Sequence, residues 1–283
     1  MVFISLSDIH LTNIIEAFQK AFCDYAVKFD SREIESMLKR RGFCQELSFA
    51  AFENDEISAF VLNGVGFYNG KLCCYDCGTG TLPEYRGLGL AGKLFQKSLP
   101  ELKNAGVRDY ILEVLTSNTT AINIYKKTGF EIVSYYDCFN QSITNIKQSP
   151  TPTINISVKR IDNLLLEAMI SYYDFIPSWQ NSLESIERAN EELIYFAAIH
   201  NNKNIGYCVC DPRSGDIASI VVDPNFRRLG VGGLLINSVL SISKAPKLKV
   251  LNVDKDCRSL HLFLEALGFE QGHSQYGMIK KLD

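Results

Sequence analysis

The stretch Leu82-Pro83-Glu84-Tyr85-Arg86-Gly87-Leu88-Gly89-Leu90-Ala91-Gly92 decides the fold, because a near copy returns as Asp223-Pro224-Asn225-Phe226-Arg227-Arg228-Leu229-Gly230-Val231-Gly232-Gly233. In both copies a proline precedes one or two arginines, and closely spaced glycines then lead into an apolar-periodic run. A glycine-rich turn that opens a helix aims several unpaired backbone N–H groups at one point, where the helix dipole adds positive potential. Each copy is therefore predicted to bind an anion such as a pyrophosphate.

A second pair of landmarks indicates that the whole chain is a duplication. The dipeptide Gly129-Phe130 follows Arg86 by 43 residues, and Gly268-Phe269 follows Arg227 by 41. Between the halves, residues 148–153 are polar and include two prolines, which is typical of a linker. The chain has 283 residues, enough for two domains of about 140 residues each. We expect a first domain at 1–141, a linker at 142–153 and a second domain at 154–283.

Hydrophobic periodicity predicts an α/β fold in each half, with a mixed, mostly antiparallel sheet flanked by helices. In the first half we expect helices at 11–25, 32–41, 87–103 and 119–128, and strands at 47–52, 57–63, 72–81, 110–115 and 131–139. In the second half we expect strands at 154–158, 194–200, 204–210, 216–222 and 248–253, followed by terminal strands. Its helices are expected up to about residue 192 and at 230–243 and 256–266.

Composition is that of an ordinary soluble globular protein, with 46% apolar and 22% charged residues. A net charge of −3 gives no general attraction to nucleic acid or to an anionic membrane. No signal peptide and no run of about 18 apolar residues is evident, so a cytoplasmic location is expected. Nine scattered cysteines predict buried free thiols, although Cys74 and Cys77 form one C-x-x-C. Neither cysteines nor the four histidines show the spacing of a metal site.

Two other phosphate-binding patterns fit the first copy alone. Residues 87–92 match the dinucleotide fingerprint G-x-G-x-x-G, and Glu113 lies about 20 residues onward, where a ribose-binding acid would stand. Residues 87–93 match G-x-x-x-x-G-K, but Leu94 replaces the serine or threonine that binds magnesium. In the second copy Leu235 stands at the third glycine of the first pattern, and the second pattern is absent. Neither pattern is therefore preferred, and a nicotinamide dehydrogenase is disfavoured.

What both copies keep is Arg-x-x-Gly-x-Gly/Ala, which resembles motif A of the GNAT superfamily of N-acetyltransferases. The run from Asn118 to Phe130 resembles that family's motif B, N-x-x-A-x-x-x-Y-x-x-x-G-F. The resemblance covers essentially the whole chain and implies two tandem GNAT-like domains. It also implies acetyl-coenzyme A as co-substrate and no metal.

The resemblance further implies a site in the first half. The backbone amides of Gly87, Leu88, Gly89, Leu90, Ala91 and Gly92, beside Arg86, would hold the pyrophosphate. A strand-end N–H near Thr81 or Leu82 would bind the acetyl carbonyl and stabilise its oxyanion. Asn118 would bind the pantetheine arm or cap the next helix, and these two roles are compatible. Tyr125 matches the tyrosine that protonates the departing thiolate.

The attacking amine must lose a proton, and two carboxylates are candidates for the base. Asp76 lies on the strand that leads into the glycine turn, near the place where some family members carry a catalytic carboxylate, and Glu113 lies on the adjacent strand. Asp76 could instead face the other side of the strand, and either group could be a solvated surface charge. Deprotonation through water remains an alternative.

The second half departs from the family pattern. A second coenzyme A site would consist of Val222, Arg227, Arg228, Leu229, Gly230, Val231, Gly232 and Gly233. Counting back from Gly268-Phe269, however, Leu264 holds the tyrosine position and Cys257 holds the asparagine position. Asp216 lies at a place similar to the family's carboxylate. The second domain is expected either to bind coenzyme A without catalysis or to be a structural relic.

The function predicted from the sequence is N-acetyl transfer in residues 1–141, by direct attack of a small-molecule or peptide amine on acetyl-coenzyme A. The alternative is a non-catalytic protein that binds or senses acyl-coenzyme A, favoured if Tyr125 faces the core. No nucleic acid or membrane partner is expected. The acceptor amine and the oligomeric state are left open.

Overall fold

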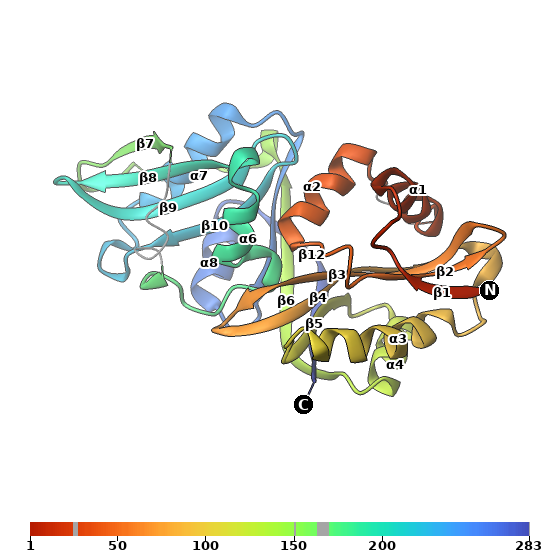
Figure 1. Ribbon diagram of the computed structural model, residues 1–283. Helices are drawn as coiled ribbons and strands as arrows, with labels where there is room; N and C mark the ends of the chain where they lie inside the picture. The colour runs from red at the N-terminus through yellow and green to blue at the C-terminus, as the bar shows by residue number, and fades with distance from the viewer. Residues whose placement is uncertain (25–27, 150, 163–169, 283) are drawn as a thin grey trace. The chain divides into compact units, whose positions relative to one another are not determined.

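The computed structural model describes residues 1–24, 28–149, 151–162 and 170–282. The chain divides into two compact units (Figure 1). Unit 1 comprises Met1–Val133 and Tyr276–Asp283, and unit 2 comprises Ser134–Gln275.

Unit 1 is a mixed sheet with helices on both faces. Its strands are β1 (Val2–Ser5), β2 (Phe49–Glu53), β3 (Glu56–Tyr68), β4 (Lys71–Thr81), β5 (Asp109–Leu115) and the end of β12 (Glu270–Lys281), in the order β1-β2-β3-β4-β5-β12. Strands β1 to β4 pair antiparallel, whereas β4 and β5 are parallel. Helices α1 (Leu11–Ala21) and α2 (Ser31–Arg41) cover one face, and α3 (Leu90–Asn104) and α4 (Thr119–Lys127) cover the other (Figure 1).

Unit 2 repeats this plan. Its strands are β6 (Glu131–Ser142), β7 (Ser157–Ile161), β8 (Ile194–His200), β9 (Lys203–Asp211), β10 (Asp216–Val222) and β11 (Lys247–Asp254), in the order β6-β11-β10-β9-β8-β7. Again one pair, β10 with β11, is parallel. Successive side chains of a strand alternate between faces, so Phe196 and Ala198 of β8 pack with α7 (Val231–Ile242) and α8 (Arg258–Ala266). Their neighbours Tyr195 and Ala197 pack with α6 (Leu183–Arg188).

The closing strands do not stay with the halves of the sequence to which they belong. Strand β6 ends the first half of the chain, yet it pairs with β11, and Phe139 is buried among the apolar residues of α7 and α8. Strand β12 ends the second half, yet Met278 and Leu282 are buried in the core of unit 1 under α3 and α4. The compact units therefore differ from the division at 142–153, because each half completes its sheet with the last strand of the other.

Most elements lie where periodicity places them, and four differences are informative. Strand β1 was not predicted, and β3 runs to Tyr68 instead of ending near residue 63. Strand β7 covers 157–161 instead of 154–158. Of the helices expected up to residue 192, the part at 163–169 lies outside the described residues; from 170 to 192 the chain forms the short α6 between two 3-10 turns. Residues 25–27, at the end of the first expected helix, also lie outside.

Local sequence explains how the helices begin and end. Asp30 and Glu33 form a reciprocal capping box at the start of α2, and Gly42 ends it in the left-handed conformation. Among the described residues, no helix is both long and apolar enough to cross a bilayer. The same residues hold no group of three or more histidine, cysteine, aspartate or glutamate side chains placed to bind a metal. All nine cysteines are free and seven are buried, as predicted.

Candidate active site

The site in unit 1 begins where two parallel strands part. Strands β4 and β5 pair only from Cys73 to Tyr75 and from Asp109 to Ile111, although both strands continue for several residues. Beyond Tyr75 and Ile111 the facing edges of β4 and β5 are no longer paired by ladder hydrogen bonds. Strand edges that part in this way offer backbone donors and acceptors to an extended chain that carries amide groups.

A β-bulge in β4 lies at this opening. Leu62 pairs with Gly78 and Asn63 with Asp76, so Cys77 is the extra residue. A bulge re-aims the side chains around it, and the sequence alone left it open which side Asp76 would face. In the structure the Asp76 carboxylate accepts hydrogen bonds from the Thr79 hydroxyl at 2.9 and 3.0 Å and from the Tyr125 hydroxyl at 2.9 Å.

Burial sets the protonation chemistry of Asp76. Its side chain is only 8% exposed, and desolvation raises its pKa to about 6 from the usual 3.8. The hydrogen bonds from Thr79 and Tyr125 act in the opposite direction, because they stabilise the ionised form. A buried carboxylate with a pKa close to the working pH is suited to accept a proton.

Tyr125 combines a packed ring with a polar contact. Its ring lies edge-on to Phe95 of α3 and to Phe130, with centroids 5.8 and 5.6 Å away. Its hydroxyl reaches from α4 to Asp76 on β4. The structure thus joins two of the three predicted catalytic residues, and it adds Thr79, which the sequence analysis missed.

Glu113 belongs to a different contact. It accepts a hydrogen bond from the Tyr75 hydroxyl, and burial raises the pKa of that phenol well above its usual value. The guanidinium of Arg41 lies 5.8 Å from the centre of the Tyr75 ring. Glu113 is thus hydrogen-bonded to Tyr75, whereas Asp76 is hydrogen-bonded to Thr79 and Tyr125.

The glycine turn has the conformation that its sequence predicts. Gly87 and Gly89 have φ of +81° and +70°, and α3 begins at Leu90 directly after Gly89. A Cβ atom added at Gly87, Gly89 or Gly92 would meet no atom within 4 Å. Leu88 is 55% exposed, whereas Leu90 packs into the core. The first amides of α3, including that of Ala91, therefore stand beside open space where an anion can approach.

The two candidate donors for the acetyl carbonyl are not equivalent. The Leu82 N–H donates to the Ser58 carbonyl across the β3–β4 ladder at 3.0 Å. In an antiparallel ladder the bonding direction alternates, so the N–H of Thr81, which pairs with Ala59, points away from β3. Thr81 is therefore the donor that the fold leaves facing the opening.

Arg86 and Asn118 both have structural partners. The Arg86 guanidinium donates to the Thr81 carbonyl at 3.3 Å, the Ala21 carbonyl at 3.0 Å and the Asp24 carboxylate at 2.7 Å. It thus ties the end of β4 to the end of α1. The Asn118 side chain caps α4 by accepting from the Ala121 N–H at 3.1 Å, which is one of its two expected roles.

Unit 2 reproduces the frame of this site with different chemistry. Its bulge lies at Ala218, and Arg227 donates to the Val222 carbonyl, the Tyr172 carbonyl and the Asp174 carboxylate, just as Arg86 does with its partners. The Arg228-Leu229-Gly230 turn precedes α7 with φ of +64° at Arg228 and +90° at Gly230.

The side chains at the reacting positions of unit 2 differ from those of unit 1. When the two bulges are aligned, Asp216 takes the position that Tyr75 has in unit 1, and Ile217 takes the position of Asp76. The expectation that Asp216 matches the carboxylate is thus off by one residue. Cys257 stands at the N-cap of α8 without the side-chain hydrogen bond by which Asn118 caps α4, and the fully buried Leu264 occupies the place of Tyr125.

Both units contain a parallel pair of strands that parts beside a glycine turn, which is the tandem GNAT-like architecture that the sequence predicts. The chain belongs to the acetyltransferase (GNAT) family, whose model matches residues 13–130 and 158–269.

Two curated relatives are similar over part of the chain. N-alpha-acetyltransferase 30 of Schizosaccharomyces pombe is 36% identical over 86 residues, which is 30% of this chain and 57% of the relative. The N-alpha-acetyltransferase of Sulfurisphaera tokodaii is 43% identical over 53 residues, 18% of this chain and 32% of the relative. The chain thus spans little more than half the length of the first and a third of the second.

Solved structures are similar over the whole chain. A tandem GNAT protein from the clavulanic acid biosynthesis pathway, solved without AcCoA, has a TM-score of 0.71 at 13% identity and covers 100% of this chain and 98% of its own. A GCN5-related N-acetyltransferase from Sphaerobacter thermophilus has a TM-score of 0.70 at 15% identity, covering 99% and 95%. At these identities the likeness shows the tandem GNAT fold.

Proposed function

We propose that this protein is an N-acetyltransferase whose unit 1 transfers the acetyl group of acetyl-coenzyme A to a primary amine by direct attack. The observation that carries the proposal is the hydrogen bond from Tyr125 to the buried Asp76, on the strand that leads into the glycine turn. It supports the proposal because a phenol and a carboxylate of raised pKa lie together close to where the β4–β5 ladder ends. An acid and a base in one small space are what an amine-to-thioester transfer requires.

The proposed steps use groups of this chain in sequence. The amides from Gly87 to Gly92 hold the pyrophosphate, and the Thr81 N–H stabilises the oxyanion of the thioester carbonyl. Asp76 accepts the proton of the amine, directly or through water, while the amine nitrogen attacks the carbonyl carbon. The C–S bond then breaks and the thiolate takes the Tyr125 proton.

The contact between Tyr125 and Asp76 couples the two proton transfers. While Asp76 is ionised, it holds the Tyr125 hydroxyl by a charge-assisted hydrogen bond. Once Asp76 has taken up the amine proton, that bond weakens and the phenol is released toward the sulfur. The acid is thus made available by the step that activates the nucleophile.

The acceptor is proposed from amine chemistry and from the relatives. At pH 7 a lysine amine costs about 4.6 kcal/mol to neutralise, whereas an α-amino group costs only about 1 kcal/mol. Asp76, with a pKa of about 6, is a weak base and is better matched to the α-amino group. The two curated relatives are named N-alpha-acetyltransferases. We therefore propose a peptide α-amino group or a small amine of similar basicity as acceptor.

The packing of Tyr125 favours a second candidate function. Its ring contacts Phe95 and Phe130 as a core tyrosine would. If the ring is held for packing alone, the chain binds acyl-coenzyme A and does not catalyse transfer.

The test mixes the full chain with acetyl-coenzyme A and one of two peptides, and it measures coenzyme A release and acetylated product. One peptide has a free N-terminus; the other is its N-terminally blocked, lysine-containing counterpart. We expect Tyr125→Phe to lower kcat by about 10²-fold or more with unchanged coenzyme A binding. The same hydroxyl deletion at Tyr195, buried on β8 in unit 2, is the control and should leave kcat unchanged. Binding without turnover on any amine would favour the second candidate. Full activity of Tyr125→Phe would refute the proposed acid.

A further inference from the structure

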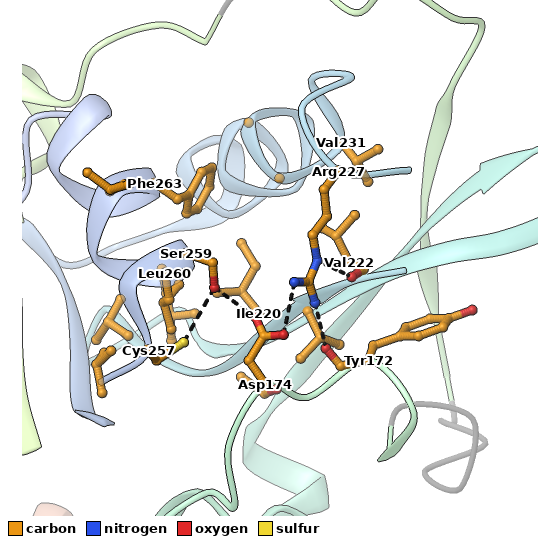
Figure 2. A pocket seen from close by; sticks show the side chains of 18 of the residues that line it. Tyr172, Asp174, Ile220, Val222, Arg227, Val231, Cys257, Ser259, Leu260 and Phe263 are labelled. Carbon is orange, nitrogen blue, oxygen red and sulfur yellow. Dashed lines mark hydrogen bonds and ion pairs between the residues drawn. The ribbon is translucent and has the colours of Figure 1, made fainter. Parts of the chain in front are cut away.

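Unit 2 contains a cavity of about 470 Å³ where β10 and β11 part. Only Asp216 and Lys249 pair between these strands. Figure 2 shows the walls: Ile220 and Val222 project from β10, and Leu260 and Phe263 from α8. The volume lies within the range of small-molecule sites, about 300–1,000 Å³.

The chain between β6 and β7 lines part of this cavity through Ser149, Thr151 and Thr153. These strands lie at opposite edges of the sheet of unit 2, so the chain that joins them must cross the unit. We call its described residues 146–149 and 151–153 the crossing segment. Lys147 donates its N–H to the Leu267 carbonyl at 2.8 Å, which fixes the segment to the end of α8.

The crossing segment then passes over the glycine turn of α7. A Cβ atom added at Gly233 would overlap the Ser149 side chain, and one added at Gly230 would lie 3.0 Å from the Pro152 Cα. The Phe263 ring would lie 2.9 Å from a Cβ added at Gly232. The turn of α3 in unit 1 is different, since the same additions there meet no atom within 4 Å.

This cover changes which ligand the cavity can take. A pyrophosphate must reach the first amides of α7, and the crossing segment and Phe263 fill the space beside them. Arg227 is also engaged, because it donates to Asp174, which in turn accepts from the Ser259 hydroxyl at 2.8 Å (Figure 2). The crossing segment, Phe263 and this ion pair thus narrow the approach to the phosphate end, although Arg227 to Gly233 still line the cavity.

The remainder of the cavity suits an amide-bearing apolar chain. Its walls are mainly aliphatic and aromatic. The Asp223 N–H donates to Ile205 across the β9–β10 ladder, so the N–H of Val222 points away from β9 toward the parting strands. Backbone donors set in an apolar wall select ligands with carbonyl or amide groups.

We propose that the cavity of unit 2 binds an elongated, largely apolar molecule that carries amide groups and no phosphate, and that the crossing segment keeps coenzyme A out of it. The chain then binds one coenzyme A, in unit 1, and a second, phosphate-free ligand in unit 2. This inference concerns binding in unit 2 and does not require unit 1 to be catalytic.

The test is calorimetry on the full chain with two probes, coenzyme A and S-acetylpantetheine. Gly89→Glu introduces bulk and negative charge at the turn of unit 1. We expect one coenzyme A per wild-type chain and none for Gly89→Glu, which should still bind S-acetylpantetheine. Adding Ile220→Trp, which fills the cavity, should weaken that remaining binding by about tenfold or more.

Arg228→Glu is the matched charge change at the turn of unit 2. It should leave coenzyme A binding unchanged, because the crossing segment already covers that turn. Two coenzyme A molecules per wild-type chain, or one bound by Gly89→Glu, would overturn the exclusion. If Gly89→Glu fails to bind S-acetylpantetheine, or binds it equally after Ile220→Trp, the cavity is not the proposed site. Circular dichroism checks that each variant is folded, and Trp179 fluorescence checks unit 2 in particular.

Discussion

The exchange of closing strands predicts that a mutation in one half of the sequence destabilises the fold of the other. Met278 lies in the last strand of the chain, is fully buried and packs in the core of unit 1. Phe139 ends the first half, is 1% exposed and packs in the core of unit 2. Truncating a buried methionine or phenylalanine to alanine costs about 2–5 kcal/mol. We expect about 3 kcal/mol for Met278→Ala and about 4 kcal/mol for Phe139→Ala.

Hydrogen exchange read by mass spectrometry separates the two units. A loss of about 3 kcal/mol speeds exchange through opening of a unit by about 10²-fold. Met278→Ala should therefore deprotect peptides from β3 and β4, and Phe139→Ala should deprotect those from β8 and β9. Trp179 gives a second readout, since the only tryptophan of the chain is buried in unit 2. Its fluorescence transition in urea should shift more with Phe139→Ala than with Met278→Ala. The opposite pattern, with each variant weakening its own half of the sequence, would refute the exchange.

Three further predictions concern the site of unit 1. Burial raises the pKa of Asp76 to about 6 in the folded chain, so ionising this carboxyl group lowers the free energy of unfolding. The wild-type chain is therefore most stable, with respect to this group, below pH 3.8, and it loses that stability as the pH rises through 6. In urea unfolding, the free energy of unfolding of Asp76→Asn minus that of the wild type should increase by up to about 3 kcal/mol between pH 4 and pH 7. A difference that does not change with pH would contradict the burial argument. Activity should rise with pH through about 6, where Asp76 becomes a base, and Thr79→Val should move that inflection upward because it removes a hydrogen bond to the carboxylate. An unmoved inflection in the pH profile of kcat/KM would show that Asp76 is not the base. Arg86→Ala should change coenzyme A affinity less than threefold in calorimetry, since its guanidinium is bound to Thr81, Ala21 and Asp24; a tenfold loss would instead indicate a phosphate contact.

The sequence predicts the parts of the site that depend on local geometry. Gly87 and Gly89 both adopt the left-handed conformation that a tight turn before a helix requires, and periodicity alone placed α3 and α4 correctly within a few residues. The helix expected at 119–128 placed Tyr125 on α4, which covers Thr119–Lys127. These features need only neighbours close in the chain.

Features that depend on contacts between distant segments could not be predicted from periodicity or motif spacing. Strands β6 and β12 both follow a Gly-Phe pair, and nothing in either pattern states which sheet each one completes. The bulge at Cys77 shifts the register of β4 by one residue, and only that shift allows Thr79 and Asp76 to meet. The equivalent bulge at Ala218 makes Ile217, and not Asp216, the counterpart of Asp76. A single extra residue in a strand leaves little trace in hydrophobic periodicity.

A comparison of the two halves separates what the fold needs from what the chemistry needs. Both halves keep the bulge, the arginine that ties the strand end to the preceding segment, and the left-handed residues before the helix. All three act on the backbone, and a sheet with parting strands requires them whether or not it catalyses. The halves differ at the side chains that would move protons: Asp76 and Tyr125 in unit 1 correspond to Ile217 and Leu264 in unit 2. Neither replacement can donate or accept a proton, and both are buried in the apolar core of unit 2. Unit 2 therefore keeps the backbone arrangement of the site without counterparts of Asp76 and Tyr125, which supports the proposal that the acid and base lie in unit 1.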